Sequence, residues 1–405
     1  MVLALALIYF ILFSGLAYKN YKLAVRLLII FLPSYFIRFN VGPLPTTLLE
    51  VMFGALLLVW LLKYAKGDWA GLKSFFQENK IISLVAISFF VFSIYGILIS
   101  GKIYASLGIW RAYFLEPFLF FIILVARRAE IKKQDLIWYL SLSTVSISVL
   151  AIVQKFTGLF YSPTLEVTEL AGRVTSFFTT PNAIGLYIAP IIPMMVYGLK
   201  DVLRRKYYAV MLFLSCLAIF WSYSEGAWVA LLVGALVATL LLGYKKIAIG
   251  LVVLSLLGAI VFAPLRQNLL FQNQSGQNRL TIWKYTWNYL SKDKTNFIFG
   301  AGTRQFFTKI QKPVNNFKKI EPLIYPHNIF LNFWSEIGLL GMLAFAGLYG
   351  LAVRTAWGIY KRDKFLGIAL LVGLVVYLVH GLVDVPYFKN DLAFLWWIYL
   401  AAIII

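Results

Sequence analysis

One histidine in the second half of the chain is placed where it could take part in proton transfer. His327 follows Pro326 and precedes Asn328, at the start of a long apolar run. Neutral histidine can accept a proton from a hydroxyl near neutral pH, so His327 is a candidate general base. Polar side chains continue along this run at spacings near three and four, namely Asn328, Asn332, Ser335 and Glu336. In a membrane helix such a stripe must face protein or water, and holding helices together is the simpler explanation of it.

Cations are concentrated just before this histidine. Residues 264–326 contain ten lysines and arginines against two acidic residues, Asp293 and Glu321. Such a stretch suits an anionic ligand near a membrane surface. Attraction to anionic lipid headgroups would explain the same charge, and composition alone does not separate the two explanations.

Part of that stretch, residues 279–290, has the periodicity of an amphipathic helix. Its hydrophobic residues recur at spacings of three and four and are expected to share one face: Leu280, Trp283, Trp287 and Leu290. Aromatic residues at this density suit the headgroup layer. Arg279 would lie at the helix start, where the helix dipole disfavours a cation, and this favours an anionic partner. An exposed arginine without a role explains the same sequence equally well.

The elements that must hold these residues are membrane helices. Of the 405 residues, 61% are hydrophobic and only 13% are charged. A soluble protein of this length could not bury so much apolar surface, and continuous apolar runs argue against a β-barrel. We therefore predict an all-α fold, a polytopic transmembrane helix bundle that forms a single membrane domain over residues 1–405. Residues 1–17 lack a basic leader and are expected to be an uncleaved span.

Twelve or thirteen apolar runs are long enough to cross a membrane. They lie near residues 1–17, 22–39, 44–64, 81–100, 106–126, 135–157, 181–199, 207–223, 226–243, 246–263, 327–352, 364–382 and 391–405. Lysine and arginine concentrate in alternate connections, such as 63–80, 127–133 and 200–206. The positive-inside rule assigns these connections to the cytoplasm.

This topology brings the residues that could do chemistry to the outer side from five separate places in the chain: Arg173, Glu225, Arg279, His327 and Asp384. Long loops are translocated largely regardless of their charge, so residues 264–326 are predicted to be an external, basic and amphipathic loop. Within it, Phe299–Arg304 contains Gly300-Ala301-Gly302 and is predicted to be a turn.

The sequence gives no indication of metal or nucleotide chemistry. Two histidines and the single cysteine, Cys216, cannot form a His/Cys metal cluster. Gly-x-Ser-x-Gly, His-Glu-x-x-His and nucleotide-binding fingerprints are absent. We therefore expect no metal, no cofactor and no nucleic-acid partner, and a substrate that arrives already activated.

The order of these features resembles the O-antigen ligase and O-antigen polymerase superfamily of bacterial envelope glycan transferases. The resemblance covers roughly the C-terminal half and rests on Arg173 followed by Pro181-Asn182, Ser224-Glu225-Gly226-Ala227, Arg279 with Trp283 and then Phe299-Gly300-Ala301-Gly302, His327-Asn328 followed by Glu336-Ile337-Gly338-Leu339-Leu340-Gly341, and Asp384. These motifs are individually weak, and their order and shared outer face carry the resemblance.

The resemblance implies a metal-independent enzyme on the outer face of the bacterial cytoplasmic (inner) membrane. Such an enzyme takes a glycan from a polyprenyl diphosphate carrier and passes it to a hydroxyl of a glycan, lipid or protein acceptor, as a ligase or a polymerase. External arginines would bind the donor diphosphate, and His327 would be the base. Guanidinium groups match phosphate oxygens and can stabilise the charge of a diphosphate leaving group.

One position departs from the family pattern. Where the family usually has Ser or Thr followed by Arg, this chain has Ser224 followed by Glu225. A carboxylate cannot bind a diphosphate, so either Arg173 or Arg304 takes that role, or Glu225 assists the base, or this member is altered in substrate or inactive. A transporter or flippase of a lipid-linked glycan is the alternative function, and a non-catalytic membrane scaffold is a third.

Overall fold

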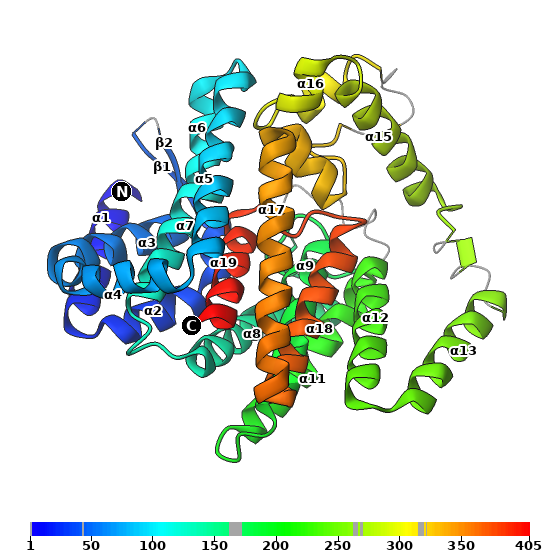
Figure 1. The fold of residues 1–405 in the computed structure, drawn as a ribbon, viewed down its shortest axis with the longest axis horizontal. Coiled ribbons are helices and arrows are strands. Elements are labelled where there is room, and N and C mark those ends of the chain that lie inside the picture. Colours follow the sequence, from blue (N-terminus) through cyan, green and yellow to red (C-terminus); the bar gives the residue numbers. More distant parts are fainter. Residues whose placement is uncertain are drawn as a thin grey trace.

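The computed structural model describes residues 2–42, 44–161, 172–261, 266–267, 270–314, 320 and 322–405. Over these residues the fold is a bundle of helices with one two-stranded antiparallel hairpin, β1–β2 (Figure 1). The prediction of an all-α helical bundle is confirmed.

The helices follow the apolar runs of the sequence. The first part of the chain forms α1 (Val2–Lys19), α2 (Tyr21–Ile30), η1 (Leu32–Phe36), β1 (Arg38–Val41), β2 (Leu44–Thr47), α3 (Leu48–Val59), η2 (Trp60–Tyr64), α4 (Ala65–Glu78), α5 (Lys80–Ser100), α6 (Ile103–Trp110), η3 (Arg111–Leu115), α7 (Glu116–Ala126) and α8 (Lys133–Thr157). The second part forms α9 (Asn182–Ile188), η5 (Ala189–Ile191), α10 (Ile192–Gly198), α11 (Arg205–Ser222), α12 (Glu225–Leu242), α13 (Lys245–Val261), α15 (Gln274–Leu290), α16 (Lys294–Phe299), η6 (Phe306–Gln311), α17 (Ile329–Arg362), α18 (Lys364–Gly381) and α19 (Asn390–Ile404).

Seven helices in the described ranges are long and apolar enough to cross a membrane: Leu48–Glu78, Lys80–Ser100, Ile103–Ala126, Lys133–Thr157, Glu225–Leu242, Ile329–Arg362 and Lys364–Gly381. Three shorter apolar helices accompany them, at Leu3–Lys19, Asn182–Gly198 and Asn390–Ile404. The chain is therefore a multi-pass membrane protein. The seven long helices are fewer than the twelve or thirteen spans predicted, although α11 and α13 also lie where spans were expected.

The predicted span at 22–39 is wrong in its second half. Helix α2 ends at Ile30 and is followed by the 3-10 turn η1, in which Pro33 stands near the start. A proline offers no N–H to a helix and disfavours helical backbone in the residue before it. The chain then forms β1, which pairs with β2 in the register Arg38 with Thr47 and Val41 with Leu44.

Helix α19 positions the turn that precedes it. Its residues from Asn390 to Ile403 are all buried, and it packs on α7, α8 and α17 in the middle of the molecule (Figure 1). Trp397 contacts Phe118 and Phe121 at ring-centroid distances of 5.2 and 5.0 Å. The residues between α18 and α19, which include Asp384, are therefore held at the centre of one end of the bundle.

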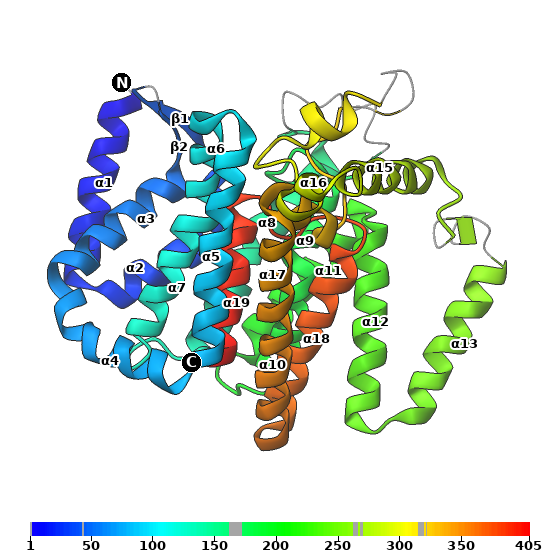
Figure 2. The same ribbon diagram turned by 45° about the horizontal axis from the view of Figure 1, so that its top comes forward.

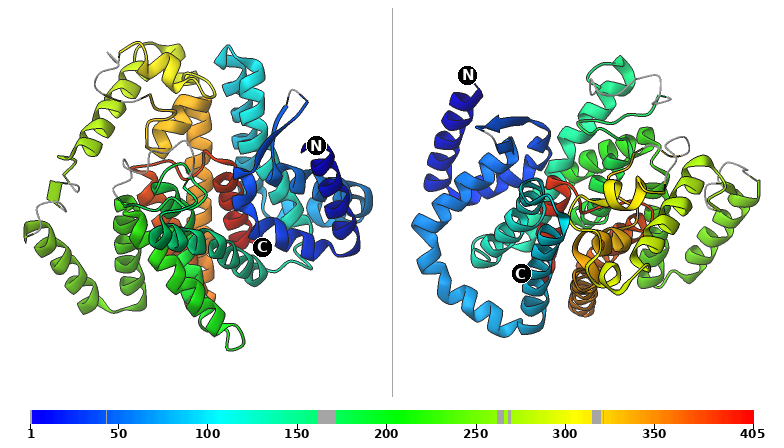
Figure 3. Two further views of the ribbon diagram at one scale, coloured as in Figure 1. Left: turned by 180° about the vertical axis from the view of Figure 1, so that it is seen from behind. Right: turned by 90° about the horizontal axis from the view of Figure 1, so that it is seen from above.

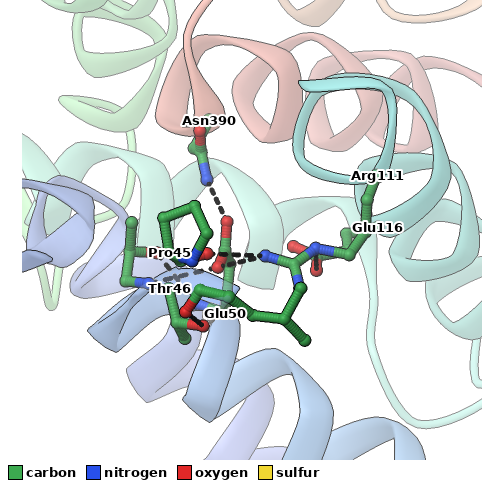
Figure 4. A network of polar contacts seen from close by, with 8 residues as sticks. Pro45, Thr46, Glu50, Arg111, Glu116 and Asn390 are labelled. Carbon is green, nitrogen blue, oxygen red and sulfur yellow. Dashed lines mark hydrogen bonds and ion pairs between the residues drawn. The ribbon is translucent and has the colours of Figure 1, made fainter. Parts of the chain in front are cut away.

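A polar network links this turn to the first part of the chain (Figure 4). Arg111 donates to Glu50 at 2.7 Å and forms an ion pair with Glu116 at 3.3 Å. The second oxygen of Glu50 accepts from the Asn390 side chain at 2.9 Å. Glu50 also accepts from the backbone N–H of Thr47, which caps α3. The network thus ties α3, η3 and α7 to the first residue of α19.

The candidate residues lie at one end of the bundle. Figure 2 shows the hairpin, α6, α15 and α16 at the top, and α4 and the connection between α12 and α13 at the opposite end. From behind and from above, the segment from α15 to α16 again lies over one end of the bundle (Figure 3). Within residues 264–326 the described chain forms α15, α16 and η6, which are joined by irregular segments.

Candidate active site

The centre of the site is a contact between His327 and Asp384. His327 Nδ1 lies 3.1 Å from Asp384 Oδ1. Asp384 is buried, whereas the His327 side chain is 24% exposed. The other ring nitrogen of His327, Nε2, has no hydrogen-bond partner among the described residues. A carboxylate on Nδ1 fixes the ring and leaves Nε2 free to accept a proton.

The backbone around His327 is fixed in an unusual conformation. His327 has φ +50°, in the left-handed region, which residues with side chains rarely adopt. Next to it, Asn328 caps α17 by accepting from the N–H groups of Phe330 and Leu331 at 3.1 Å. The Asn328 amide donates to Leu382 O at 3.0 Å, in the turn that carries Asp384. One residue therefore starts the helix and also holds the two halves of the pair together.

Helix α15 docks directly beside this segment. The Trp283 indole N–H donates to Pro326 O at 2.9 Å. The Tyr325 ring meets the His327 ring edge-on, with centroids 5.3 Å apart. These contacts place the amphipathic helix over the candidate base.

The prediction for that helix is confirmed in its existence and wrong in two details. Helix α15 begins at Gln274, where Asn273 caps it, so Arg279 lies in the second turn. The dipole argument for Arg279 therefore fails, since the dipole acts mainly within the first turn. The buried side chains are Ile282, Thr286 and Leu290, whereas Leu280 and Trp287 are 41% and 51% exposed. Tertiary packing selected a face that is offset from the one expected.

Asp384 is held as a carboxylate by its neighbours. Burial by itself would raise the pKa of Asp384, but the charge and hydrogen bond of His327, the nearby His380 and the N–H of Val385 together hold it well below its usual range. Val385 N donates to Asp384 Oδ1 at 2.9 Å. Asp384 therefore stays ionised at neutral pH.

The second histidine, His380, lies one helical turn before Asp384. Its Nδ1 is buried and has no hydrogen-bond partner within the described residues. A Cβ on Gly226 would lie 2.8 Å from the His380 ring, and one on Gly185 would lie 3.1 Å from it. The His380 ring thus joins α18 closely to α9 and α12. Sequence reasoning did not assign His380 to the site.

Arg173 is anchored in a second cluster. Its guanidinium donates to Ser222 O at 2.8 Å, to Asn182 Oδ1 at 2.9 Å and to Tyr223 O at 3.3 Å. The carbonyls belong to the end of α11, where the helix dipole favours a cation. Burial lowers the pKa of Arg173, and the nearby Glu225 opposes that shift. The fold thus brings Asn182 and Glu225, both of which the sequence analysis singled out, close to Arg173.

Arg279 lies on α15, the helix that also carries Trp283. It lies within electrostatic range of His380. Its side chain is partly exposed, and it forms no hydrogen bond or ion pair with another described residue. An arginine without a partner beside a histidine–carboxylate pair leaves a fork of N–H donors for an anion.

Arg304 lies in a different environment. Its backbone N–H donates to Glu336 Oε2 at 2.6 Å, and its φ is +59°. Its side chain is exposed, within electrostatic range of Glu336 and Tyr113. These neighbours differ from those of Arg173 and Arg279, so no described contact of Arg304 is shared with the other two arginines. Glu336, which belongs to the polar stripe of α17, therefore holds the turn that contains Arg304.

Two cations near the site, Lys389 and Arg38, were not selected from the sequence. Lys389 is within electrostatic range of Asp384, Asp391 and Arg38. Burial lowers the pKa of Lys389, and the two carboxylates oppose this. Both cations belong to short connections that hold little other charge, and this was the available signal. Among the described residues no group of three or more His, Cys, Asp or Glu side chains could hold a metal ion.

Comparisons with known proteins find similarity in the part of the chain that carries several of these residues. Residues 210–346 match the family model described as O-antigen ligase. A 163-residue stretch is 29% identical to an O-antigen ligase of Salmonella typhimurium (strain LT2), covering 36% of this chain and 39% of that protein. The family match includes Glu225, Arg279, Arg304 and His327, whereas Arg173 and Asp384 lie outside it. This part of the chain is therefore similar to O-antigen ligases, and the chain spans well under half the length of the curated relative that it matches.

Proposed function

We propose that this protein transfers a glycan from a polyprenyl diphosphate carrier to an acceptor hydroxyl, on the external face of the bacterial cytoplasmic membrane. The observation that carries the proposal is the His327–Asp384 contact together with Arg279, which lies within electrostatic range of the neighbouring His380 and whose guanidinium lacks a partner among the described residues. A base and a cation side by side are what this reaction requires, because it removes a proton from one substrate and releases an anion from the other.

In the proposed reaction the acceptor oxygen attacks the anomeric carbon of the donor glycan. His327 Nε2 takes the hydroxyl proton as the new glycosidic bond forms. The bond between the anomeric carbon and the diphosphate oxygen breaks, and its electron pair leaves with polyprenyl diphosphate. Asp384 stabilises the imidazolium that results. The proton then passes from His327 to solvent or to the departing diphosphate.

Arg279 and Arg173 are proposed to bind the diphosphate. A hydrogen bond to a charged group contributes roughly 1.5–3 kcal/mol, so two arginines suffice for a large effect on rate. Arg173 is held by two carbonyls and one amide, and such anchoring reduces the entropy lost when it binds a ligand. Glu225, which replaces the family's usual arginine, is proposed to act through Arg173 by lying next to it.

The test uses the full-length protein in detergent with a polyprenyl diphosphate-linked oligosaccharide and a mixture of candidate acceptors. Released polyprenyl diphosphate and the glycosylated acceptor are both measured. We expect release by the natural protein and its loss in His327→Ala and Arg279→Ala. Lys284→Ala is the matched control, because Lys284 is an exposed cation on the same helix as Arg279.

Two outcomes would contradict the proposed site. If the natural protein releases no polyprenyl diphosphate with any acceptor, or if both variants release it at the natural rate, the proposed site is wrong. Transport of the lipid-linked glycan would then be measured in vesicles that carry the same proteins.

A further inference from the structure

A groove at the same end of the molecule has no role in the reaction described so far. It has a volume of about 360 Å³ and lies between the start of α6 and the segment around η6. Its lining combines two cations with apolar side chains: Lys102, Ala105, Arg304, Phe307, Leu323 and Ile324. Ligand sites in proteins have volumes of about 300–1,000 Å³, so the groove could hold a small part of a larger molecule.

The walls of the groove are built from segments about 200 residues apart and are firmly joined. Thr303 N donates to Gly96 O at 2.9 Å, and the Ser106 hydroxyl donates to Thr303 O at 3.3 Å. Lys309 Nζ donates to Ile99 O at 2.9 Å and to Ala301 O at 2.8 Å. The groove is thus preformed, which lowers the entropic cost of binding a ligand.

The third wall connects the groove to the candidate base. Leu323 N donates to Gln311 Oε1 at 2.8 Å, which fixes residues 322–324 against η6. These residues continue directly into Tyr325, whose ring lies on His327. Tyr113 lies within electrostatic range of both Arg304 and Tyr325.

The groove and the Arg173 cluster are formed by different elements. Arg173 is bound to residues of α9 and of the α11–α12 turn, whereas the groove is lined by Lys102 and α6, by η6 and the two residues before it, and by residues 322–324. A transfer reaction needs its two substrates on different sides of the reacting centre. In the proposed reaction Arg279, near His380, and Arg173 bind the diphosphate, which leaves the groove for the other substrate.

The charge of the groove indicates what that substrate carries. Lys102 and Arg304 are both exposed, and neither forms an ion pair with a carboxylate in the part of the chain that the structure describes. On the assumption that the proposed function holds, we propose that this groove binds the acceptor glycan and that Lys102 and Arg304 recognise a carboxylate or phosphate group on it. The apolar floor formed by Phe307 and Leu323 packs against the sugar ring.

The experiment measures transfer at a fixed donor concentration with matched pairs of acceptors. One pair is a uronic acid-containing oligosaccharide and its carboxyl-reduced form, and the other is a phosphorylated oligosaccharide and its dephosphorylated form. The variants are Lys102→Gln and Arg304→Gln, which keep polar side chains on the groove. Lys294→Gln is the control, because Lys294 is an exposed cation on α16 outside the groove.

We expect each groove variant to raise the KM for an anionic acceptor about tenfold or more, with kcat at saturating acceptor and the KM for donor unchanged. The neutral acceptors and Lys294→Gln should show no such change. The acceptor pair that responds identifies the anion as carboxylate or phosphate.

Two results would overturn the inference, and they are distinguishable. If the natural protein transfers glycan but both groove variants keep its KM for every acceptor, the groove assignment is wrong and the proposed function stands. If the natural protein releases no polyprenyl diphosphate at all, the proposed function fails and the groove assignment fails with it.

Discussion

His327 and Asp384 are 57 residues apart in the sequence and 3.1 Å apart at their side chains. One precedes α17 and the other follows α18, so the contact exists only because these two helices pack as an antiparallel pair. The carboxylate binds the nitrogen that points into the protein, and the other nitrogen remains available. In the proposed reaction this arrangement orients His327 as the base and stabilises the charge that it acquires.

The first prediction concerns the two members of this pair. His327→Ala should lower kcat by about 10²–10⁴-fold, which is the usual contribution of a general base. Asp384→Asn should lower kcat less, by roughly tenfold or more, because the base remains but loses its carboxylate partner. Donor binding, measured by the donor concentration that protects against thermal unfolding, should stay near the natural value in both. Loss of donor protection in Asp384→Asn would instead mean that the residue has a structural role in the donor site.

The second prediction concerns pH. The pKa of Asp384 is lower in the folded protein than its ordinary value of about 3.9. Its stabilising contribution is therefore fully present above that ordinary value and is lost as the pH falls through the folded pKa. Between pH 5 and 8 Asp384 stays ionised, so a fall of activity on acidification in that range reports another group. Since loss of the neighbouring negative charge disfavours an imidazolium, Asp384→Asn should shift the acidic limb of the rate profile to lower pH.

Two measurements check this. Rate profiles of the natural protein and Asp384→Asn are compared from pH 5 to 9, and their unfolding midpoints are compared from pH 7 down to 3. Below about pH 4 the natural protein should lose more stability than the variant. An acidic limb that stays at the same pH in the variant would show that Asp384 does not act on the titrating group.

The sequence predicted these helices better than it predicted their partners. Apolar runs and positive-inside charge located α5, α8, α12 and α18 within a few residues, and the start of α17 but not its end, because those signals are local. The same reasoning brought His327 and Asp384 to one face. It could not show that the two touch, because a contact across 57 residues depends on how α17 packs on α18.

The errors arose where tertiary packing overrode a local pattern. The buried face of α15 is set by Ile282, Thr286 and Leu290, and Ile282 packs with Phe306 and Ile310 of η6, whereas Leu280 and Trp287 remain exposed. Periodicity alone does not decide which face of the helix is buried when Trp and Leu on one face alternate with Thr and Ile on another. The hairpin β1–β2 was missed because its strands lie at the end of one predicted span and the start of the next, although Pro33 and Pro45 interrupt the apolar sequence there.

The third prediction separates Arg279 from the general charge of its helix. Arg279→Ala should lower kcat/KM for donor by roughly tenfold to a hundredfold, as expected for the loss of one or two charged hydrogen bonds. Arg279→Lys should recover only part of this, because lysine lacks the planar fork that matches a diphosphate. Lys284→Ala should leave the rate within about twofold. Equal losses in Arg279→Ala and Lys284→Ala would show that the helix acts only by its net charge.

The fourth prediction concerns the kink in α17. Gly338 interrupts this helix with φ +80°, and a Cβ there would lie 2.6 Å from Ile298 O. The kink lets α17 receive the turn at residues 300–304, where Ala301 N and Gly302 N donate to Ser335 O. Gly338→Ala should destabilise the fold by at least about 1–2 kcal/mol from the backbone conformation alone, with the clash adding to it.

Thermal unfolding in detergent checks this, with Gly350→Ala as the control on the same helix. Gly350 has no heavy atom within 4 Å of an added Cβ and no positive φ, so alanine there should be neutral or slightly stabilising. If Gly338→Ala unfolds at the same temperature as Gly350→Ala, the kink relaxes at little cost in free energy.

The last prediction concerns the network that ties α19 to the first part of the chain. Arg111 lies between Glu50 and Glu116, whose side chains are 7% and 10% exposed, and Glu50 in turn binds Asn390. Arg111→Gln would leave two buried carboxylates facing each other without a cation, and breaking a buried ion pair in this way typically costs about 3–5 kcal/mol. Arg111 is itself about one-third exposed (32%), so we expect a lower but clear loss of the unfolding midpoint. Because Asn390 begins the helix that fixes the turn of Asp384, kcat should fall as well. Arg354→Gln, which changes an exposed cation on α17, should alter neither quantity.

The double variant Arg111→Gln with Glu116→Gln removes one of the two unpaired carboxylates and should recover part of the loss in the unfolding midpoint. If it melts no higher than Arg111→Gln, the cost lies in lost packing of the arginine side chain and not in the unpaired carboxylates.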